Sequence, residues 1–412
     1  MSNNFKKCHE LKVMRDPVHG YINVEYQIIW DLINAPEFQR LRRIHQLGGT
    51  YQVYHGAEHS RFSHSVGVYE LVRNIIEKVA GLKDVLSEFE VVALLCAGLL
   101  HDVGHGPFSH AFEAVTSVNH EEFTDRIILE DTHINKILRE TSEDLPQLVA
   151  DIIAHRAERK LLTQIISSQL DADRMDYLLR DSYFTGVSYG EFDLNRIIRT
   201  LKVVDDRIVV KESGIHAVED YIMARYQMYW QVYLHPTSRS FEMILLALFK
   251  RMRDLTLEDR NAMDSISFIK PFVSKGDISL KAHYQLDEST CLSGFMTLTE
   301  CDDPILRDLS SRLLNRDLFK YQDVLDNDQM ESIVASVRNL GYDPEYYVIQ
   351  DYTTQILYMP YEEGVDSGIW VQMKDGSLVE LSKASSIVHG FATGNMKEDS
   401  KVFFPDKVRT EI

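Results

Sequence analysis

Hydrophobic positions recur with helical spacing over most of the first 255 residues of the chain. In one segment the apolar side chains stop shortly before Gly81, as in an amphipathic helix followed by a C-terminal glycine: Val68, Leu71, Val72, Ile75, Ile76 and Val79. Residues 91–100 are apolar on every side, which predicts a helix buried at the centre of a bundle. Asn119, followed by Glu122, resembles a capping box that begins a further helix.

The pattern changes in two places, where strand-forming residues replace helical spacing. Residues 202–211 predict a hairpin that turns at Asp205-Asp206, and the chain from about residue 345 is rich in strand formers, with a turn at Asp375-Gly376. Two helical stretches are expected in between, at residues 238–255 and 293–325. We therefore expect a mainly α protein with two parts: a helical core over residues 1–255 and a smaller α+β C-terminal lobe over residues 256–412.

Composition and charge narrow the class of protein. Hydrophobic residues make up 44% and charged residues 26% of the 412 residues, which argues against a disordered chain or a coiled-coil rod. The formal net charge of −19 repels phosphate backbones, so broad nucleic-acid binding is disfavoured. A small anionic ligand in one locally basic pocket is compatible with that charge.

The sequence predicts a cytoplasmic protein without a membrane partner. The longest apolar run, residues 91–100, falls short of the ~20 residues that a membrane helix needs, and the N-terminus lacks the apolar core of a signal peptide. The four cysteines have no CxxC spacing and are expected to be free thiols: Cys8, Cys96, Cys291 and Cys301.

The most informative string is HDVGHGPFSH at residues 101–110, directly after the buried run. His101 and Asp102 offer an imidazole nitrogen and a carboxylate side by side, and the two glycines of the string would let a ligand come close. His64 and an aspartate from residues 171–177 would complete a set that suits a divalent cation. Spacing alone cannot join residues so far apart, and a single histidine in a helical protein is more commonly a hydrogen-bonded structural residue.

The order His64, His101-Asp102, Asp173 resembles the signature of the HD-domain metal-dependent phosphohydrolases. Further strings resemble one branch of that family, the deoxynucleoside triphosphate (dNTP) triphosphohydrolases, which includes the SAM-and-HD-domain enzyme of animals and its bacterial relatives. These strings are residues 16–20, 37–42, 46–48, 61–65 and 101–110. The resemblance spans roughly residues 10–330 and looks closest to the bacterial Firmicutes-type members.

The resemblance implies a metal-dependent hydrolase. Its metal ligands would be His64, His101, Asp102 and Asp173, while two neighbouring aspartates, Asp171 and Asp176, would cap a helix or contact the ligands. A bound divalent ion (Mn, Mg, Fe, Co, Ni or Zn) would lower the pKa of a water and polarise the α-phosphate of a dNTP. Attack at that phosphate would leave a deoxynucleoside and triphosphate.

Histidines around the metal ligands could supply the proton that a leaving group needs. His120 with Glu121 resembles the catalytic His-Glu pair of the family, and His110 could be a leaving-group acid oriented by Glu113. We assign the role of general acid jointly to His110 and His120. His105 is a third imidazole that flanks the metal ligands.

Substrate contacts are also implied by the resemblance. The matching positions are Arg61, Arg174 and Arg225 for the phosphates, Gln46, Tyr177 and Asp181 for the 3′-hydroxyl, and Leu47 for the sugar ring. Tyr233 would exclude a 2′-hydroxyl, and its spacing from Arg225 and Tyr229 places all three on one helix face. The animal enzyme has histidine at the position of Tyr229 and glutamine at that of Leu234, so the base preference stays open.

Animal and several bacterial members of the family are activated by a guanine nucleotide bound between subunits, so the resemblance implies a homotetramer with a GTP or dNTP effector. The first pocket would contain Lys12, Val13, Asn34, Gln39, Arg42, Arg316 and Lys320, where Asn34 replaces the aspartate that reads guanine. A second pocket is partly retained in Val53, Tyr54, Arg196 and Lys211, with Ser213 and Ala217 in place of polar or basic residues. Alternatively, the basic residues form salt bridges between subunits.

Two other functions compete with dNTP hydrolysis. An HD-type hydrolase could act on another phosphoester, such as a nucleoside monophosphate, a cyclic nucleotide or an alarmone, but the candidate sugar contacts speak against that: Gln46, Tyr177, Asp181 and Tyr233. A nucleotide-sensing regulator or single-strand nucleic-acid binder would not need a complete set of metal ligands, and the acidic charge disfavours nucleic acid as a partner.

Overall fold

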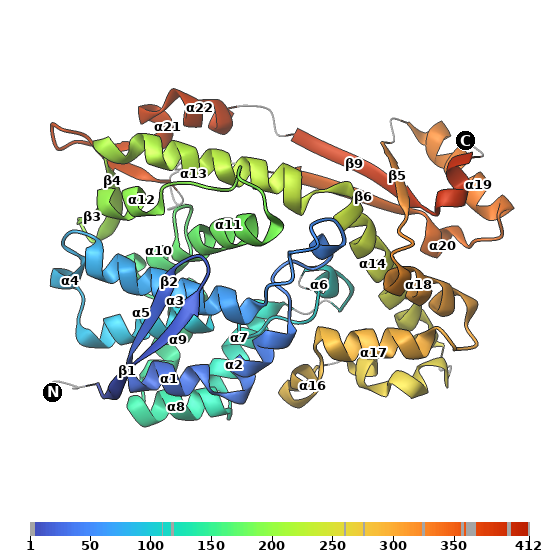
Figure 1. Cartoon of the computed structure of the whole chain (residues 1–412), viewed down its shortest axis with the longest axis horizontal. Helices are drawn as coiled ribbons and strands as arrows, with labels where there is room; N and C mark the ends of the chain where they lie inside the picture. The colour runs from blue at the N-terminus through green and yellow to red at the C-terminus, as the bar shows by residue number, and fades with distance from the viewer. Residues whose placement is uncertain are drawn as a thin grey trace.

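The computed structural model describes residues 5–108, 110–116, 119–258, 261–274, 277–323, 326–355, 358–359, 368–393 and 397–410. Helices dominate and the sheets are small, which confirms the predicted mainly α class (Figure 1). None of the helices within these ranges is long and apolar enough to cross a membrane.

A helix that is apolar on all sides lies at the centre of the first core, as predicted. This helix, α5 (Glu88–Leu100), begins at Ser87, which forms a capping box with Glu90, and it is buried from Val92 to its end. It packs against α3 (Arg61–Lys78), α9 (Leu145–Ile153) and α10 (Lys160–Ile166). Other helices of the first part of the chain are α1 (Gln27–Ile33), α2 (Pro36–Arg40), α4 (Leu82–Val85), α7 (His120–Leu129), α8 (His133–Thr141), α11 (Ala172–Thr185), α12 (Leu194–Thr200) and α13 (Ile215–Met228).

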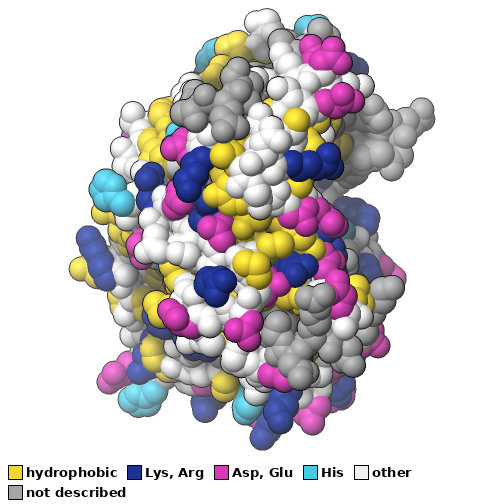
Figure 2. Space-filling model, turned by 90° about the vertical axis from the view of Figure 1, so that its right-hand side faces the viewer, with side chains coloured by type: hydrophobic (Ala, Val, Ile, Leu, Met, Phe, Trp, Pro, Cys, Tyr) yellow, Lys and Arg dark blue, Asp and Glu magenta, His cyan; other side chains and the backbone are white. Residues whose placement is uncertain are grey.

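A second core surrounds the long helix α14 (Pro236–Leu257). Phe108, within the HD string, and Phe112 and Phe123, which follow it, reach into this core. Its helices are α6 (His110–Thr116), α15 (Lys270–Val273), α16 (Leu280–Gln285), α17 (Glu288–Leu298), α18 (Pro304–Asn315), α19 (Asn327–Asn339) and α20 (Pro344–Tyr347). Figure 2 shows the face on this side of the molecule, where acidic and basic side chains are interspersed with hydrophobic ones.

Two hairpins lie in the first part of the chain. β1 (Lys7–Asp16) and β2 (Gly20–Tyr26) form an antiparallel N-terminal hairpin, which our sequence analysis did not predict. β3 (Leu201–Val204) and β4 (Arg207–Lys211) form the predicted hairpin. Both turn residues, Asp205 and Asp206, have positive φ angles of 49° and 55°, as a tight two-residue turn requires.

The C-terminal part of the chain contributes to both cores. β4 pairs in parallel with β7 (Trp370–Gln372), which pairs with β8 (Leu378–Glu380) across the predicted Asp375-Gly376 turn. This segment then packs in the first core through Ile369, Val371, Leu381 and Val388. Beside the second core, a three-stranded sheet has the order β5 (Lys320–Asp323), β9 (Lys397–Phe404), β6 (Ile349–Gln355). Both cores therefore contain residues from both sides of position 255, and a domain division there stays a prediction.

Shorter elements complete the chain. They are α21 (Leu381–Ala384), α22 (Ser386–Thr393), the 3-10 turns η1 (Leu41–Arg43), η2 (Thr50–Gln52), η3 (Glu212–Gly214), η5 (Asn261–Ile269) and η6 (Asp406–Thr410), and the π-helix η4 (Tyr229–Tyr233). The four cysteines are free, as predicted.

Two predicted helical features differ from the structure. The stretch 293–325 includes α17 and α18 but ends in strand β5, because Arg316 adopts a left-handed conformation (φ 57°) that stops α18. Asn119 does begin α7, but its side chain accepts a hydrogen bond from the Glu121 backbone N–H at 2.8 Å, and no capping box with Glu122 forms there.

Close approach of α3 and α5 generates the first prediction. A Cβ atom at Gly98 would lie 2.8 Å from Val72 Cγ2, a stiff β-branched side chain. We expect Gly98→Ala to lower the free energy of unfolding by about 1–3 kcal/mol through overpacking. Gly390→Ala is the matched control, because Gly390 lies inside α22 with open space around it and should cost nothing. Urea denaturation measures both, and equal effects would contradict the close approach.

Candidate active site

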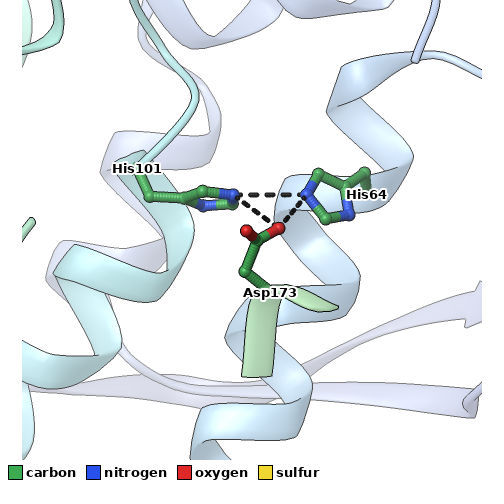
Figure 3. Close-up of side chains that lie close together, drawn as sticks. All are labelled: His64, His101 and Asp173. Carbon is green, nitrogen blue, oxygen red and sulfur yellow. Dashed lines mark hydrogen bonds and ion pairs between the residues drawn. The ribbon is translucent and has the colours of Figure 1, made fainter. Parts of the chain in front are cut away.

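Three side chains from three helices converge on one point (Figure 3). His64 lies in the first turn of α3, His101 at the C-terminal end of α5, and Asp173 in the first turn of α11. His64 Nε2 lies 3.2 Å from His101 Nε2 and 3.1 Å from Asp173 Oδ1, and His101 Nε2 lies 3.5 Å from the same oxygen. Such a cluster of imidazole nitrogens and a carboxylate oxygen has the chemistry of a divalent-cation site.

Asp102 lies at the edge of this cluster. Its Oδ2 is 3.8 Å from His64 Nε2, and its Oδ1 is 3.5 Å from His101 Nε2 and 3.4 Å from His105 Nε2. Its carboxylate also pairs with Arg61. Burial alone would raise the pKa of Asp102, but His101, Arg61 and His105 outweigh burial and hold that pKa well below its ordinary value. Asp102 is therefore an ionised carboxylate shared between two groups of histidines.

The orientation of both converging imidazoles fits a metal ligand. Asp176 Oδ2 lies 2.8 Å from His64 Nδ1, and the carbonyl oxygen of Gly98 lies 3.1 Å from His101 Nδ1. An acceptor on Nδ1 suits the tautomer whose Nε2 can bind a cation, and the two Nε2 atoms face the shared position. The donor set and its supporting hydrogen bonds are thus suited to a cation.

Asp176 is itself held by a buried network. His19 Nε2 lies 2.5 Å from Asp176 Oδ1, and Arg180 donates to both carboxylate oxygens at 2.8 and 2.9 Å. Arg180 also donates to Asp16 at 2.8 Å, so a charge from β1 supports α11. Burial would raise the pKa of Asp176, but Arg180 and the two histidines keep it well below its usual value. Asp171 instead caps α11 by accepting from the Arg174 backbone N–H at 2.7 Å.

A second group of histidines lies beside the first. The rings of His105 and His120 stack with centroids 3.8 Å apart, and His120 Nδ1 lies 2.5 Å from Glu113 Oε1. Burial and Arg61 hold the pKa of His105 well below its ordinary value, so this imidazole is neutral at pH 7. Glu113 thus contacts His120, whereas the side chain of its predicted partner His110 lies outside the described residues. Glu121 is exposed at the start of α7.

The glycine after the HD pair does not serve the purpose expected from sequence. A Cβ atom at Gly104 would overlap the backbone of α7 at His120 and Thr124. Gly104 therefore allows the loop of residues 101–108 (the HD loop) to lie against α7, which brings His105 to His120. The space beside Gly104 is filled by α7 and is not an opening for a ligand.

The predicted sugar contacts lie together at the far end of α11. Asp181 accepts a hydrogen bond from the Tyr233 hydroxyl at 2.7 Å and lies 2.8 Å from His59 Nε2. The rings of Tyr177 and Tyr233 meet edge to face at 6.2 Å, and burial raises the pKa of Tyr177 to about 12, so it stays a hydrogen-bond donor. Gln46 joins this region through its backbone N–H, which donates to the His59 carbonyl at 2.9 Å. His59 carried no sequence signal of its own.

Tyr229 and Tyr233 lie in a π-helix that follows α13, so the expected α-helical face with Arg225 is interrupted at Met228. Their rings still meet at 6.2 Å. A π turn in this position is common at functional sites. Leu47 packs against the first core, and Arg174 bonds Asp171 at 3.1 Å.

The predicted effector residues of the first pocket lie on several elements, among them β1, the end of α1, α2 and η1. Lys12 lies over the Trp30 ring, Asn34 donates to the Trp30 carbonyl at 2.7 Å, and Arg42 donates to Gln39 at 2.9 Å. Val13 is half-exposed on β1. The two remaining residues lie on other elements. Arg316 donates to the Gln52 carbonyl at 2.9 Å, and Lys320, the first residue of β5, lies 4.0 Å from Asp406 of η6.

One residue of the second predicted pocket lines a basic hollow. This hollow has a volume of about 450 Å³ and is lined by Lys78, Asp193, Asn195, Arg196 and Arg199. Arg196 also donates to the Ser213 carbonyl at 2.8 Å, and Lys211 donates to the Arg199 carbonyl at 3.4 Å. Tyr54, next to Val53, instead donates to the Gln231 carbonyl at 2.8 Å.

Known proteins resemble the chain over both parts of this site. Residues 61–181 match the HD domain and residues 192–275 the HD associated region. The chain is 46% identical to the uncharacterized protein YwfO of Bacillus subtilis, over 97% of this chain and 93% of that protein. It is 28% identical to the human deoxynucleoside triphosphate triphosphohydrolase SAMHD1, over 76% of this chain and 55% of that protein. The crystal structure of a phosphohydrolase from Bacteroides thetaiotaomicron has a TM-score of 0.84 at 31% identity, over 96% of this chain and 100% of that one.

A buried histidine behind the His105–His120 pair gives a pH prediction. His283 stacks on Phe123 of α7 at 4.1 Å, and burial, followed by Arg40, holds its pKa well below the ordinary value. Below pH 6.5 the unfolded chain therefore binds a proton at this histidine that the folded protein does not bind. The free energy of unfolding consequently decreases as the pH decreases. Between pH 6.5 and 5.5 the wild type should lose about 1 kcal/mol more than His283→Met in chemical denaturation. Parallel pH profiles would contradict this.

Proposed function

This chain belongs to the HD-domain family of phosphohydrolases, and on that premise we propose that it hydrolyses dNTPs to a deoxynucleoside and triphosphate. The observation that carries the proposal is the convergence of His64 Nε2, His101 Nε2 and Asp173 Oδ1 within 3.1–3.5 Å of one another. With Asp102, these residues would hold a divalent cation. When bound, such an ion polarises a phosphate oxygen and lowers the pKa of a water.

His120 is the better supported of the two proposed acids. Glu113 orients its ring through Nδ1, and the neutral His105 ring stacks beside it. A general acid needs this kind of fixed orientation toward the leaving 5′ oxygen of a nucleoside. His110 shares the role in the proposal because it begins α6, the helix that also carries Glu113.

The hydroxyl-rich end of α11 suits a deoxyribose. Tyr177 and Tyr233 remain protonated because burial raises the pKa of both, and Asp181 can accept from a sugar hydroxyl. We propose that Asp181, Tyr177 and Gln46 bind the 3′-hydroxyl, that Leu47 packs on the ring, and that Tyr233 leaves no room for a 2′-hydroxyl. This arrangement favours a nucleotide with a deoxyribose over other phosphoesters.

The phosphates would be bound by Arg61, Arg174 and Arg225. Arg61 is already paired with Asp102, so it lies next to the proposed cation position. Local cations matter here because the net charge of the chain is −19 and its global field repels a triphosphate.

Relatives support the reaction without fixing the substrate of this chain. Human SAMHD1 is a dNTP triphosphohydrolase, and the similar Bacteroides protein is described as a phosphohydrolase. We further propose that a GTP or dNTP effector binds the two predicted pockets in a cytoplasmic homotetramer. Supporting observations are the contacts of Lys12 with Trp30 and of Arg42 with Gln39, and the basic hollow beside Arg196.

Product analysis tests the reaction. Purified protein with Mn²⁺ and each dNTP, alone and in pairs, should yield deoxynucleoside and intact tripolyphosphate. The variant His101→Ala/Asp102→Ala should lose its bound metal, measured by elemental analysis, and at least about 1,000-fold of the rate. His216→Ala is the matched control, because His216 is exposed on α13. Release of phosphate or pyrophosphate in place of tripolyphosphate would point to the other phosphoester reactions and overturn the proposal.

Effector binding can be tested separately. Arg42→Ala removes a guanidinium from the first pocket, so the effector concentration for half-maximal activation should rise about tenfold or more, as expected for one lost charge-assisted contact. Arg139→Ala, an exposed arginine on α8, should leave the activation curve unchanged. An unchanged curve in Arg42→Ala, or full activity of each dNTP alone in the absence of any other nucleotide, would count against the first pocket.

A further inference from the structure

The start of α17 contacts the HD loop, although the two segments are distant in sequence. Leu286 and Asp287 precede α17, and Glu288 is its first residue. These three residues contact Arg40, Arg43 and His45, and Glu288 also contacts the HD loop at Phe108. The second core thus touches the loop that presents His105 to His120.

Glu288 makes the direct contact with this loop. Its Oε1 accepts hydrogen bonds from the backbone N–H of Phe108 at 3.1 Å and of His45 at 3.0 Å, while Oε2 pairs with His45 Nδ1. The side chain is buried, with 3% exposure. Two backbone donors would lose their partner if this carboxylate were removed, and a buried donor left unpaired costs about 1–3 kcal/mol.

Glu288 is not needed to cap its own helix. Asp287 caps α17 by accepting from the Thr290 backbone N–H at 2.9 Å. The oxygens of Glu288 point instead to the other part of the chain. Asp287 therefore stabilises the start of α17, whereas Glu288 stabilises the HD loop.

Arg40 forms a second link between the same segments. Its guanidinium is buried and donates to the His105 carbonyl at 2.8 Å and to the Leu286 carbonyl at 2.7 and 3.2 Å. Burial lowers the pKa of Arg40 to about 10, so it remains charged at pH 7. The HD loop is therefore fixed at His105 and at Phe108, three residues apart.

Phe108 shows why the loop needs such support. It has a φ of 57°, a left-handed conformation that bulky residues rarely adopt. Its ring packs in the second core, 6.0 Å from Phe295 of α17 and 6.1 Å from Phe241 of α14. Strained backbone of this kind persists only where surrounding contacts hold it.

From these contacts we infer that Glu288 is a positioning residue for the HD loop, acting through the Phe108 backbone to keep His105 stacked on His120. The inference rests on the proposed function, because the reaction that the HD loop would assist is the proposed hydrolysis. The contacts that the structure describes for the Glu288 side chain go to His45 and Phe108, and none of them reaches a proposed metal ligand or His120. Its loss should therefore change turnover more than substrate or metal binding.

Kinetics of matched variants test this role. Glu288→Ala should lower kcat about 10- to 100-fold, the effect of a small misplacement of catalytic groups, with KM and metal content within about threefold of wild type. Glu288→Gln keeps an acceptor oxygen for both backbone donors and should retain at least about a third of kcat. Asp303→Ala is the control, because this buried residue caps α18 and pairs with Arg251 in the same core without contact to the HD loop.

Hydrogen exchange adds a readout that needs no activity. In Glu288→Ala the Phe108 amide should exchange at least about tenfold faster than in wild type, and in Asp303→Ala it should not. If Glu288→Ala does not fold, the wild type still tests the inference. Its Phe108 amide should then exchange through the same opening as the Thr290 and Cys291 amides of α17, with the same denaturant dependence.

Several results would overturn the inference. They are a kcat of Glu288→Ala within twofold of wild type, an equal loss of kcat in Asp303→Ala, unchanged exchange at Phe108, or an opening of Phe108 independent of α17. Failure of the proposed function looks different, because a wild type that hydrolyses no dNTP would leave the exchange results intact. The kinetic comparison would then be made on whichever phosphoester the wild type hydrolyses.

Discussion

Close packing of α3 against α5 is the constraint on which the site depends. The two helices approach at Gly98 and Val72, and each carries one of the converging histidines. The Gly98 carbonyl also holds the His101 ring, so the same residue sets the helix distance and the direction of an imidazole. A wider spacing would separate His64 Nε2 from His101 Nε2, which lie 3.2 Å apart. The convergence of the two imidazoles therefore follows from helix packing in an apolar core.

Burial of charge supports this packing. Arg180 and Arg40 are almost fully buried, and each joins segments that are far apart in the chain. Arg180 ties the N-terminal hairpin to α11, and Arg40 ties α2 to the start of α17. A buried charge is costly unless every donor finds an acceptor, so such residues specify one arrangement of the surrounding segments more than they add net stability.

Much of the fold and the cluster of candidate metal ligands could be predicted from sequence, because local patterns and a family signature indicate them. Three such features can be recognised in the sequence alone: the apolar run 91–100, the Asp205-Asp206 turn, and the order His64, His101-Asp102, Asp173. His59 and Glu288 were not identified, because each acts through contacts across more than 100 positions and neither belongs to a periodic pattern. The N-terminal hairpin was missed because its strands are mostly polar and it forms a sheet of only two strands.

The return of the C-terminal segment to the first core has a consequence for how the chain folds during its synthesis. The buried part of the first core comes mainly from residues 22–232, and later residues complete it: Tyr358, Ile369, Val371, Leu381 and Val388. β4 likewise gains its partner β7 about 160 residues later in the chain. The helices of the first core can assemble early on the ribosome, but an apolar face and a strand edge stay uncovered until the last segments emerge. The chain is thus most prone to aggregation while the second core is being synthesised, because the first core is completed only when residues 369–388 have been made.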